Sequence, residues 1–145
     1  MTDNALLNAD GHEISVGVSI GTFARETGFA TWNRYAAVND EFVPIHMDDA
    51  AGQAAGYDGA FGMGNLQWAY MHNLVRGWMG EGGRLTRFSC QFRKPNLKGQ
   101  VTAFGKVTGV TESSSGTEVE LEVWTEDESG DRMAPATATV LFAAS

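Results

Sequence analysis

The chain has 145 residues, of which 43% are hydrophobic and 19% charged, with a net charge of −8 at pH 7 and one cysteine, Cys90. This composition is typical of one globular domain and excludes a disordered chain, a coiled coil, an internal disulfide and a cysteine-rich zinc site. The acidic balance argues against nucleic-acid binding, and no apolar run approaches the roughly 18 residues that span a bilayer. We therefore expect one cytoplasmic domain over residues 1–145, in which residues 1–13 form a loose tail without a signal pattern.

The first half of the chain predicts short helices joined by loops. Residues 14–24 are expected to form an opening strand or extended entry, and the hydroxyl of Thr27 is suited to cap a helix that ends near Asn39. Pro44 then predicts a non-helical approach to the next segment, because proline restricts the residue before it. Residues 48–55 are predicted as another short helix.

The longest predicted helix covers residues 65–79. Its apolar side chains form two stripes, and a helix that is apolar on nearly all sides belongs inside a protein. The first stripe holds Leu66, Ala69, Tyr70, Leu74 and Trp78, and the second holds Trp68, Met71, Val75 and Met79.

After residue 83 the hydrophobic period changes to two, which is typical of strands. Phe88, Cys90 and Phe92 alternate with polar residues, and the same alternation recurs in residues 101–110, 119–125 and 136–142. Turn-forming residues at 113–116 and 128–131 separate these runs. We predict an α+β fold in which an antiparallel meander with one buried face wraps around the long helix.

The charges are unevenly distributed along the chain. Basic residues dominate residues 76–106, whereas residues 112–131 are rich in acids and contain no base. One interpretation is two solvated faces of the sheet. The other is a local basic patch that would suit a small phosphorylated ligand.

His46 is the residue most suggestive of chemistry. It follows Pro44 and lies between two acidic pairs, Asp40 with Glu41 and Asp48 with Asp49. An imidazole with a carboxylate in reach suits general acid–base catalysis, although such a histidine can also be structural. The histidines and carboxylates show no recognised metal-ligand spacing, so we expect no metal site.

The segment that contains His46 resembles the signature of the MaoC-like (R)-specific enoyl-CoA hydratases. Residues 35–48 match its run of an aromatic residue and two alanines, followed by an acid, Phe, Pro, Ile and His. Gly64 has the family's spacing from His46, and residues 92–95 resemble the family's strand ending. The resemblance covers residues from about 16 to the C-terminus and implies the hot-dog fold.

The resemblance also implies an activity and the roles of individual residues. The reaction would be hydration of a trans-2-enoyl-CoA, or the reverse dehydration, with coenzyme A thioester as substrate and no further cofactor. His46 would be the general base, and Glu41, in the place of the family's aspartate, or Asp40 would hold the water or relay a proton. The substrate would be bound by Gly64 with its neighbours Met63 and Asn65, by His72 along the helix, and by Arg93 and Lys94 at the phosphates.

Several alternatives remain open at this point. The chain would act as a homodimer or as a heterodimer with another hot-dog chain, and it would be an active enzyme or a non-catalytic or half-catalytic subunit. A hot-dog thioesterase is a further alternative, although the helix over residues 65–79 lacks a carboxylate that many thioesterases carry. A CoA-free binding module or a structural protein is the last. The acyl group is open, from a short chain to a steroid or polyketide.

Overall fold

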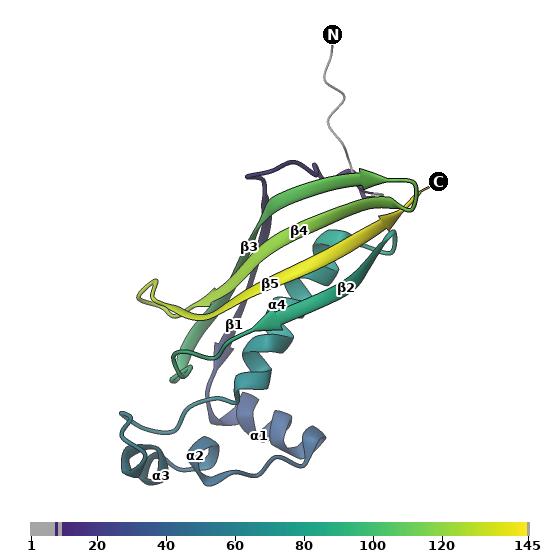
Figure 1. The fold of residues 1–145 in the computed structure, drawn as a ribbon. Helices are drawn as coiled ribbons and strands as arrows, with labels where there is room; N and C mark the ends of the chain where they lie inside the picture. Colours follow the sequence, from purple (N-terminus) through teal and green to yellow (C-terminus); the bar gives the residue numbers. More distant parts are fainter. Residues whose placement is uncertain (1–7, 9, 145) are drawn as a thin grey trace.

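The structure, a computed structural model, describes residue 8 and residues 10–144. Five strands form one antiparallel sheet with the order β1-β3-β4-β5-β2. The strands are β1 (Ser19–Thr27), β2 (Gly83–Cys90), β3 (Gly99–Ser113), β4 (Gly116–Glu126) and β5 (Arg132–Ala143). The helices are α1 (Phe29–Asn39), α2 (Pro44–Met47), α3 (Asp49–Ala54) and α4 (Gly64–Met79). The sheet curves around α4, as Figure 1 shows.

The predicted meander is correct for β3, β4 and β5, which follow one another through the two predicted turns. It is wrong for β2, which pairs with β5 at the edge of the sheet opposite β1. The loop over residues 91–98 therefore leads from the edge strand β2 across the sheet to β3, which lies next to the opposite edge strand, β1. Strand periodicity indicates which face is buried, but it contains no information on which strand lies next to which. Phe92, assigned to this strand from its alternation, lies beyond the strand's last residue, Cys90.

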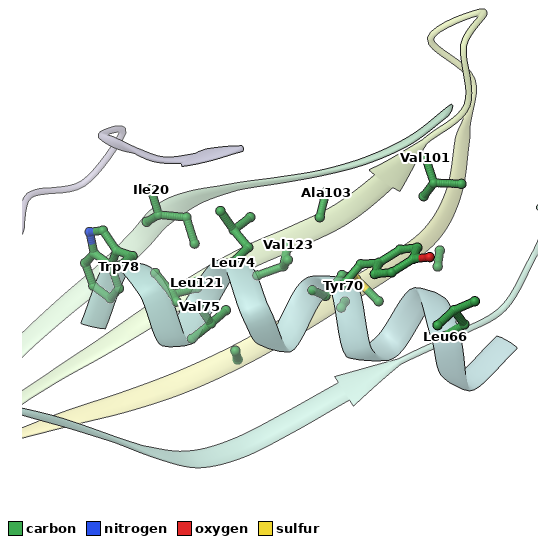
Figure 2. Packing of buried hydrophobic residues seen from close by; sticks show 14 of the residues in the cluster. Ile20, Leu66, Tyr70, Leu74, Val75, Trp78, Val101, Ala103, Leu121 and Val123 are labelled. Atoms are coloured by element: carbon green, nitrogen blue, oxygen red, sulfur yellow. The ribbon is translucent and has the colours of Figure 1, made fainter. Parts of the chain in front are cut away.

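Helix α4 contributes one stripe to a core that it shares with the concave face of the sheet. Leu66, Tyr70, Leu74 and Trp78 are buried, and Figure 2 shows them beside inward residues of the sheet. Those sheet residues are Ile20, Val101, Ala103, Leu121 and Val123. The predicted helix is confirmed, with its first turn beginning one residue earlier.

The second predicted stripe of α4 is not buried throughout. Met71 and Val75 are enclosed, but Trp68 remains 38% exposed. Its indole and the imidazole of His72 lie near Phe88 of the edge strand β2, with the His72 and Phe88 rings stacked at 4.3 Å. One face of α4 is therefore open in the single chain, and the expectation of a helix enclosed on all sides is wrong.

The predicted N-terminal elements need two corrections. Strand β1 begins at Ser19 and extends through Thr27, so Thr27 is a strand residue and Gly28 occupies the cap position of α1. The hydroxyl of Thr27 donates to the carbonyls of Leu97 and Gly99 instead. The end of α1 at Asn39 and the helix within residues 48–55 are confirmed.

Most of the predicted loose tail lies outside the described residues. Asn8 and His12 are described, and both contact the C-terminal end of α4. The side-chain amide of Asn8 donates to the carbonyl of Trp78 at 2.6 Å, and Nδ1 of His12 lies 3.1 Å from the same oxygen. This part of the segment is held against the fold, in contrast to the expectation.

Helices α1, α2 and α3 gather at one end of the molecule, where α4 begins (Figure 1). The loop over residues 91–98 approaches the same end, since the carbonyl of Asn96 accepts from the amide of Gly62 at 2.8 Å. This end therefore brings together the segments that contain the candidate residues. No helix in the described part of the chain is long and apolar enough to cross a membrane.

Candidate active site

His46 lies on α2, a helix of one turn, rather than in the expected loop. Asp40 ends α1 in the left-handed conformation, with φ 53° and ψ 42°, which redirects the chain. Val43 is extended, as expected for a residue before proline, and Pro44 then opens α2. Proline fits the first position of a helix because the amide it lacks would have no partner there. This short helix carries His46 into the interior, where 7% of the residue is exposed.

The imidazole of His46 is held by the backbone. Its Nδ1 lies 2.6 Å from the carbonyl oxygen of Phe61, and its ring meets the Phe61 ring edge-on at 5.4 Å. A carbonyl only accepts, so the hydrogen of the neutral imidazole belongs on Nδ1. The lone pair is then on Nε2, which is the arrangement that a general base requires.

His46 opens into a cavity of about 180 Å³. This cavity lies between α2, the loop before α4, the first turn of α4 and the loop over residues 91–98. Its lining residues are His46, Tyr57, Phe61, Gly62, Gly64, Gln67, Phe92, Arg93, Lys94 and Pro95. The structure therefore brings together four of the residues proposed from the sequence: His46, Gly64, Arg93 and Lys94.

Gly64 opens α4 at the wall of this cavity. No side chain caps the first turn of α4, although the carbonyl of Met63 accepts from the amide of Leu66 at 3.1 Å. The amides of Gly64 and Asn65 have no acceptor within the helix, and the positive end of the helix dipole lies at the cavity wall. A Cβ on Gly64 would lie 2.7 Å from a ring atom of Phe92, so glycine allows the Phe92 ring to approach the start of α4 closely. Met63 itself is fully buried and Asn65 is exposed, and neither lines the cavity.

Gln67, one turn into α4, is a cavity residue that sequence reasoning missed. It is buried, accepts from the hydroxyl of Thr125 at 2.6 Å and donates to the carbonyl of Lys94 at 3.4 Å. Thr125 in turn accepts from the amide of Ala134 at 3.1 Å. Gln67 therefore ties the start of α4 to the sheet and to the loop over residues 91–98. The available signal was a polar residue next to Leu66 in an otherwise apolar stretch.

The predicted carboxylates do not line the cavity. Asp40 is exposed and Glu41 is half-buried. The pKa of Tyr35 is raised by burial and by the negative charge of Glu41, so Glu41 lies near the Tyr35 phenol. Among the described residues, neither carboxylate hydrogen-bonds His46, whose ring contacts the Phe61 carbonyl instead.

The acids that follow His46 have structural contacts. Asp48 caps α3 by accepting from the amide of Ala50 at 3.1 Å. Asp49 accepts from Lys98 at 2.8 Å and from the amide of Ala60 at 3.0 Å. These bonds, that of Lys98 above all, hold the pKa of Asp49 below its ordinary value.

The two basic residues at the cavity have different partners. Lys94 forms ion pairs with Asp127 at 2.8 Å and Asp131 at 2.9 Å, and its hydrogen bond to Asp127 is the main cause of its raised pKa. The guanidinium of Arg93 donates to the side-chain oxygen of Gln91. Because Gln91 is neutral, these contacts do not compensate the positive charge of Arg93. Arg93 is therefore better suited than Lys94 to bind a phosphate.

His72 lies away from the cavity. It is two turns along α4 from Gly64, a separation of about 12 Å along the helix axis. Its Nδ1 lies 3.0 Å from the carbonyl of Trp68, and its ring stacks on Phe88. The structure therefore places it in the aromatic group at the edge of the sheet. In the described part of the chain, no group of three or more metal-ligating side chains is arranged to hold a metal ion.

Comparison with known proteins connects this geometry to a family. A family model described as MaoC like domain matches residues 15–130. No curated protein matches the chain.

Solved structures share the fold. An (R)-hydratase from A. caviae involved in PHA biosynthesis superposes with a TM-score of 0.79 at 23% identity, covering 89% of this chain and 97% of that one. The ChsH1-ChsH2 complex from Mycobacterium tuberculosis gives 0.76 at 18% identity, covering 88% and 98%. The HadBC (3R-hydroxyacyl-ACP dehydratase) complex from the same organism gives 0.63 at 15%, covering 81% and 90%. These likenesses confirm the expected hot-dog fold.

Proposed function

The chain belongs to the MaoC-like family, and from this premise we propose that it catalyses the reversible hydration of a trans-2-enoyl-CoA to a (R)-3-hydroxyacyl-CoA. The observation that carries the proposal is one cavity lined by both His46 and Gly64. The first, as a neutral imidazole, presents the lone pair of Nε2, and the second lies at a helix start that no side chain caps. Addition of water to an activated double bond needs these two functions, a base and a site for developing negative charge.

In the proposed mechanism, Nε2 of His46 takes a proton from water as its oxygen bonds to C3 of the substrate. The electron pair of the double bond moves toward the thioester oxygen, and the amide of Gly64 and the dipole of α4 stabilise this charge. A proton then adds to C2 and completes the hydration. Protonated His46 can return this proton, so the cycle balances with one titrating group. Neither Glu41 nor Asp40 lines the cavity in the single chain, so either would have to move toward His46 in order to hold the water.

Mutation of His46 tests this mechanism. His46→Ala should reduce the hydration rate of a trans-2-enoyl-CoA by about 100-fold or more, the usual contribution of a general base. His12→Ala is the matched control, because His12 contacts the far end of α4 at Trp78 and should leave the rate unchanged. An active wild type whose His46→Ala variant keeps its full rate would refute the assignment.

The same assay separates the two carboxylates. Glu41→Gln should be damaging, and Asp40→Asn nearly silent, if Glu41 holds the water. The reverse result would assign that role to Asp40. If neither variant loses activity, the water is held by His46 alone or by another chain.

We further propose that a second hot-dog chain completes the site. The cavity of about 180 Å³ is smaller than the roughly 300–1,000 Å³ typical of small-molecule sites. Strand β2 ends the sheet with an open edge, and the aromatic group of Trp68, His72 and Phe88 lies beside it. An open edge and an exposed apolar group are features that a partner covers. Sedimentation should show a dimer at micromolar concentration, and a stable monomer would contradict the proposal.

A second candidate is a supporting subunit of a two-chain hydratase. It is favoured by the contact of His46 with a backbone carbonyl rather than with either predicted carboxylate. In this case the isolated chain would be inactive and would gain activity with a co-expressed hot-dog protein. Retention of that activity by the His46→Ala complex would place the chemistry on the other chain.

A further inference from the structure

The peptide unit between Phe61 and Gly62 is bonded at both ends. Its carbonyl lies 2.6 Å from Nδ1 of His46, and its amide donates to the carbonyl of Asn96 at 2.8 Å. The amide of Phe61 also donates to the carbonyl of Ile45 at 3.2 Å. One planar group therefore lies between His46 on one side and the loop over residues 91–98 on the other.

These two bonds act in line. The peptide is trans, so its carbonyl and its amide hydrogen point in opposite directions. Consecutive hydrogen bonds polarise one another, so donation to Asn96 strengthens acceptance from His46. The Asn96 carbonyl therefore influences the imidazole indirectly, through the Phe61–Gly62 peptide, and favours the tautomer with its hydrogen on Nδ1.

Space around Gly62 allows this arrangement only for glycine. A Cβ built on Gly62 would collide with the side-chain oxygen of Asn96 and would lie 2.6 Å from Nε1 of Trp32. Asn96 is 1% exposed and Trp32 is fully buried, so neither side chain can turn into solvent to make room. A larger residue at position 62 must therefore displace either these buried side chains or the peptide that holds His46.

We propose that Gly62 is a positioning residue for His46, with Asn96 as its anchor. Gly62 lets the Phe61–Gly62 peptide lie between Asn96 and the imidazole, and this peptide keeps the hydrogen on Nδ1 and the lone pair on Nε2. The role in catalysis rests on the proposed function, but the control of the tautomer stands on this geometry alone.

Nitrogen NMR of the imidazoles tests the tautomer without an activity assay. The chain has three histidines, so signals are assigned by removing His12, His46 and His72 one at a time. We expect neutral His46 of the wild type to carry its hydrogen on Nδ1, and the Gly62 amide to exchange slowly with solvent. A hydrogen on Nε2, or rapid exchange at Gly62, would overturn the proposal even if no variant folds.

The Gly62→Ala variant tests the positioning role. It should give His46 signals from both tautomers, and kcat should fall by about 100-fold with little change in KM, the scale of a misplaced catalytic group. Gly77→Ala is the matched control, because a Cβ on this exposed glycine of α4 meets nothing within 4 Å. A folded Gly62→Ala protein with an unchanged tautomer and kcat would refute the proposal.

A second-site variant separates positioning from general destabilisation. Asn96→Ala removes the side chain that collides with a Cβ on Gly62 but leaves the backbone carbonyl that anchors the peptide. The double variant Gly62→Ala/Asn96→Ala should therefore recover part of the Nδ1 tautomer and of kcat. A double variant no better than Gly62→Ala would count against the steric argument. An inactive wild type with the expected tautomer would overturn the proposed function while leaving the positioning role intact.

Discussion

Replacing Thr125 by valine tests how much the hydrogen bond between α4 and the sheet contributes to stability. The Thr125 side chain is fully buried, donates to Gln67 at 2.6 Å and accepts from the amide of Ala134 at 3.1 Å. Valine has the same shape but leaves the Gln67 oxygen and the Ala134 amide without this partner. Each buried group left unpaired costs about 1–3 kcal/mol, so with two such groups the free energy of unfolding should fall by about 2–6 kcal/mol.

This loss is large for the chain. A domain of this length has a free energy of unfolding of roughly 7–20 kcal/mol, and each kcal/mol lowers Tm by about 2–4 °C. Urea denaturation followed by the fluorescence of the four tryptophans measures the change. The control is Thr111→Val, which lies on an exposed position of β3 and should stay within about 0.5 kcal/mol. Thr125→Val should also lower the proposed hydration activity, because Gln67 lines the cavity.

The result that would refute this reasoning is a loss below about 1 kcal/mol, or one no larger than that of Thr111→Val. The bond from Thr125 to Gln67 would then contribute little to stability. The contact of Gln67 with the loop over residues 91–98 would not be part of a network that stabilises the start of α4. A loss of stability with full activity would confirm the Thr125–Gln67 contact but would show that the proposed active site does not require it.

The remaining predictions concern single residues outside the cavity. Gly77→Ala should raise the free energy of unfolding by up to about 1 kcal/mol in urea denaturation, since alanine favours a helix and its Cβ fits; a loss would show an unseen contact. Thr27→Val should lower stability by about 1 kcal/mol through the lost bonds to Leu97 and Gly99, and an unchanged midpoint would contradict those bonds. The pKa of Asp49 is lowered in the folded state by Lys98, so its stabilisation is present above the unfolded pKa near 4 and is lost as the pH falls through the folded value. Asp49→Asn should therefore flatten the acid limb of the stability profile, and an identical acid limb would exclude this contribution.

Local patterns were sufficient for the main elements. The two stripes of residues 65–79 predicted α4 to within one residue of its start, and alternation after residue 83 predicted strands with one buried face. The helix and the strands depend on neighbours in the chain, and the periods of 3.6 and 2 record them directly. The pairing of His46 with Gly64 at the cavity came instead from the resemblance to the family signature.

Other features depended on contacts between distant segments. The place of β2 beside β5 is set by how the strands fold around α4, and its own alternation is compatible with either neighbour. Trp68 has the hydrophobicity of a core residue, yet it lies on the open face of α4 because the sheet covers only one side of the helix. Thr27 has the chemistry of a cap, but β1 continues through it and its hydroxyl turns to the loop over residues 91–98.

The sequence by itself determined the elements of this hot-dog domain and the presence of a histidine in a family signature. The tertiary structure alone decided what surrounds that histidine. Phe61, whose carbonyl contacts the imidazole, is 15 residues away in the chain, and the carbonyl of Asn96 bonds to the amide of Gly62 from a third segment. The acids next to His46 in sequence suggested its partner, but the reversal at Asp40 and the turn of α2 direct its ring to a carbonyl. Sequence proximity predicts helices and strands because their bonds are local, whereas an active site is assembled from side chains that only the packed fold brings together.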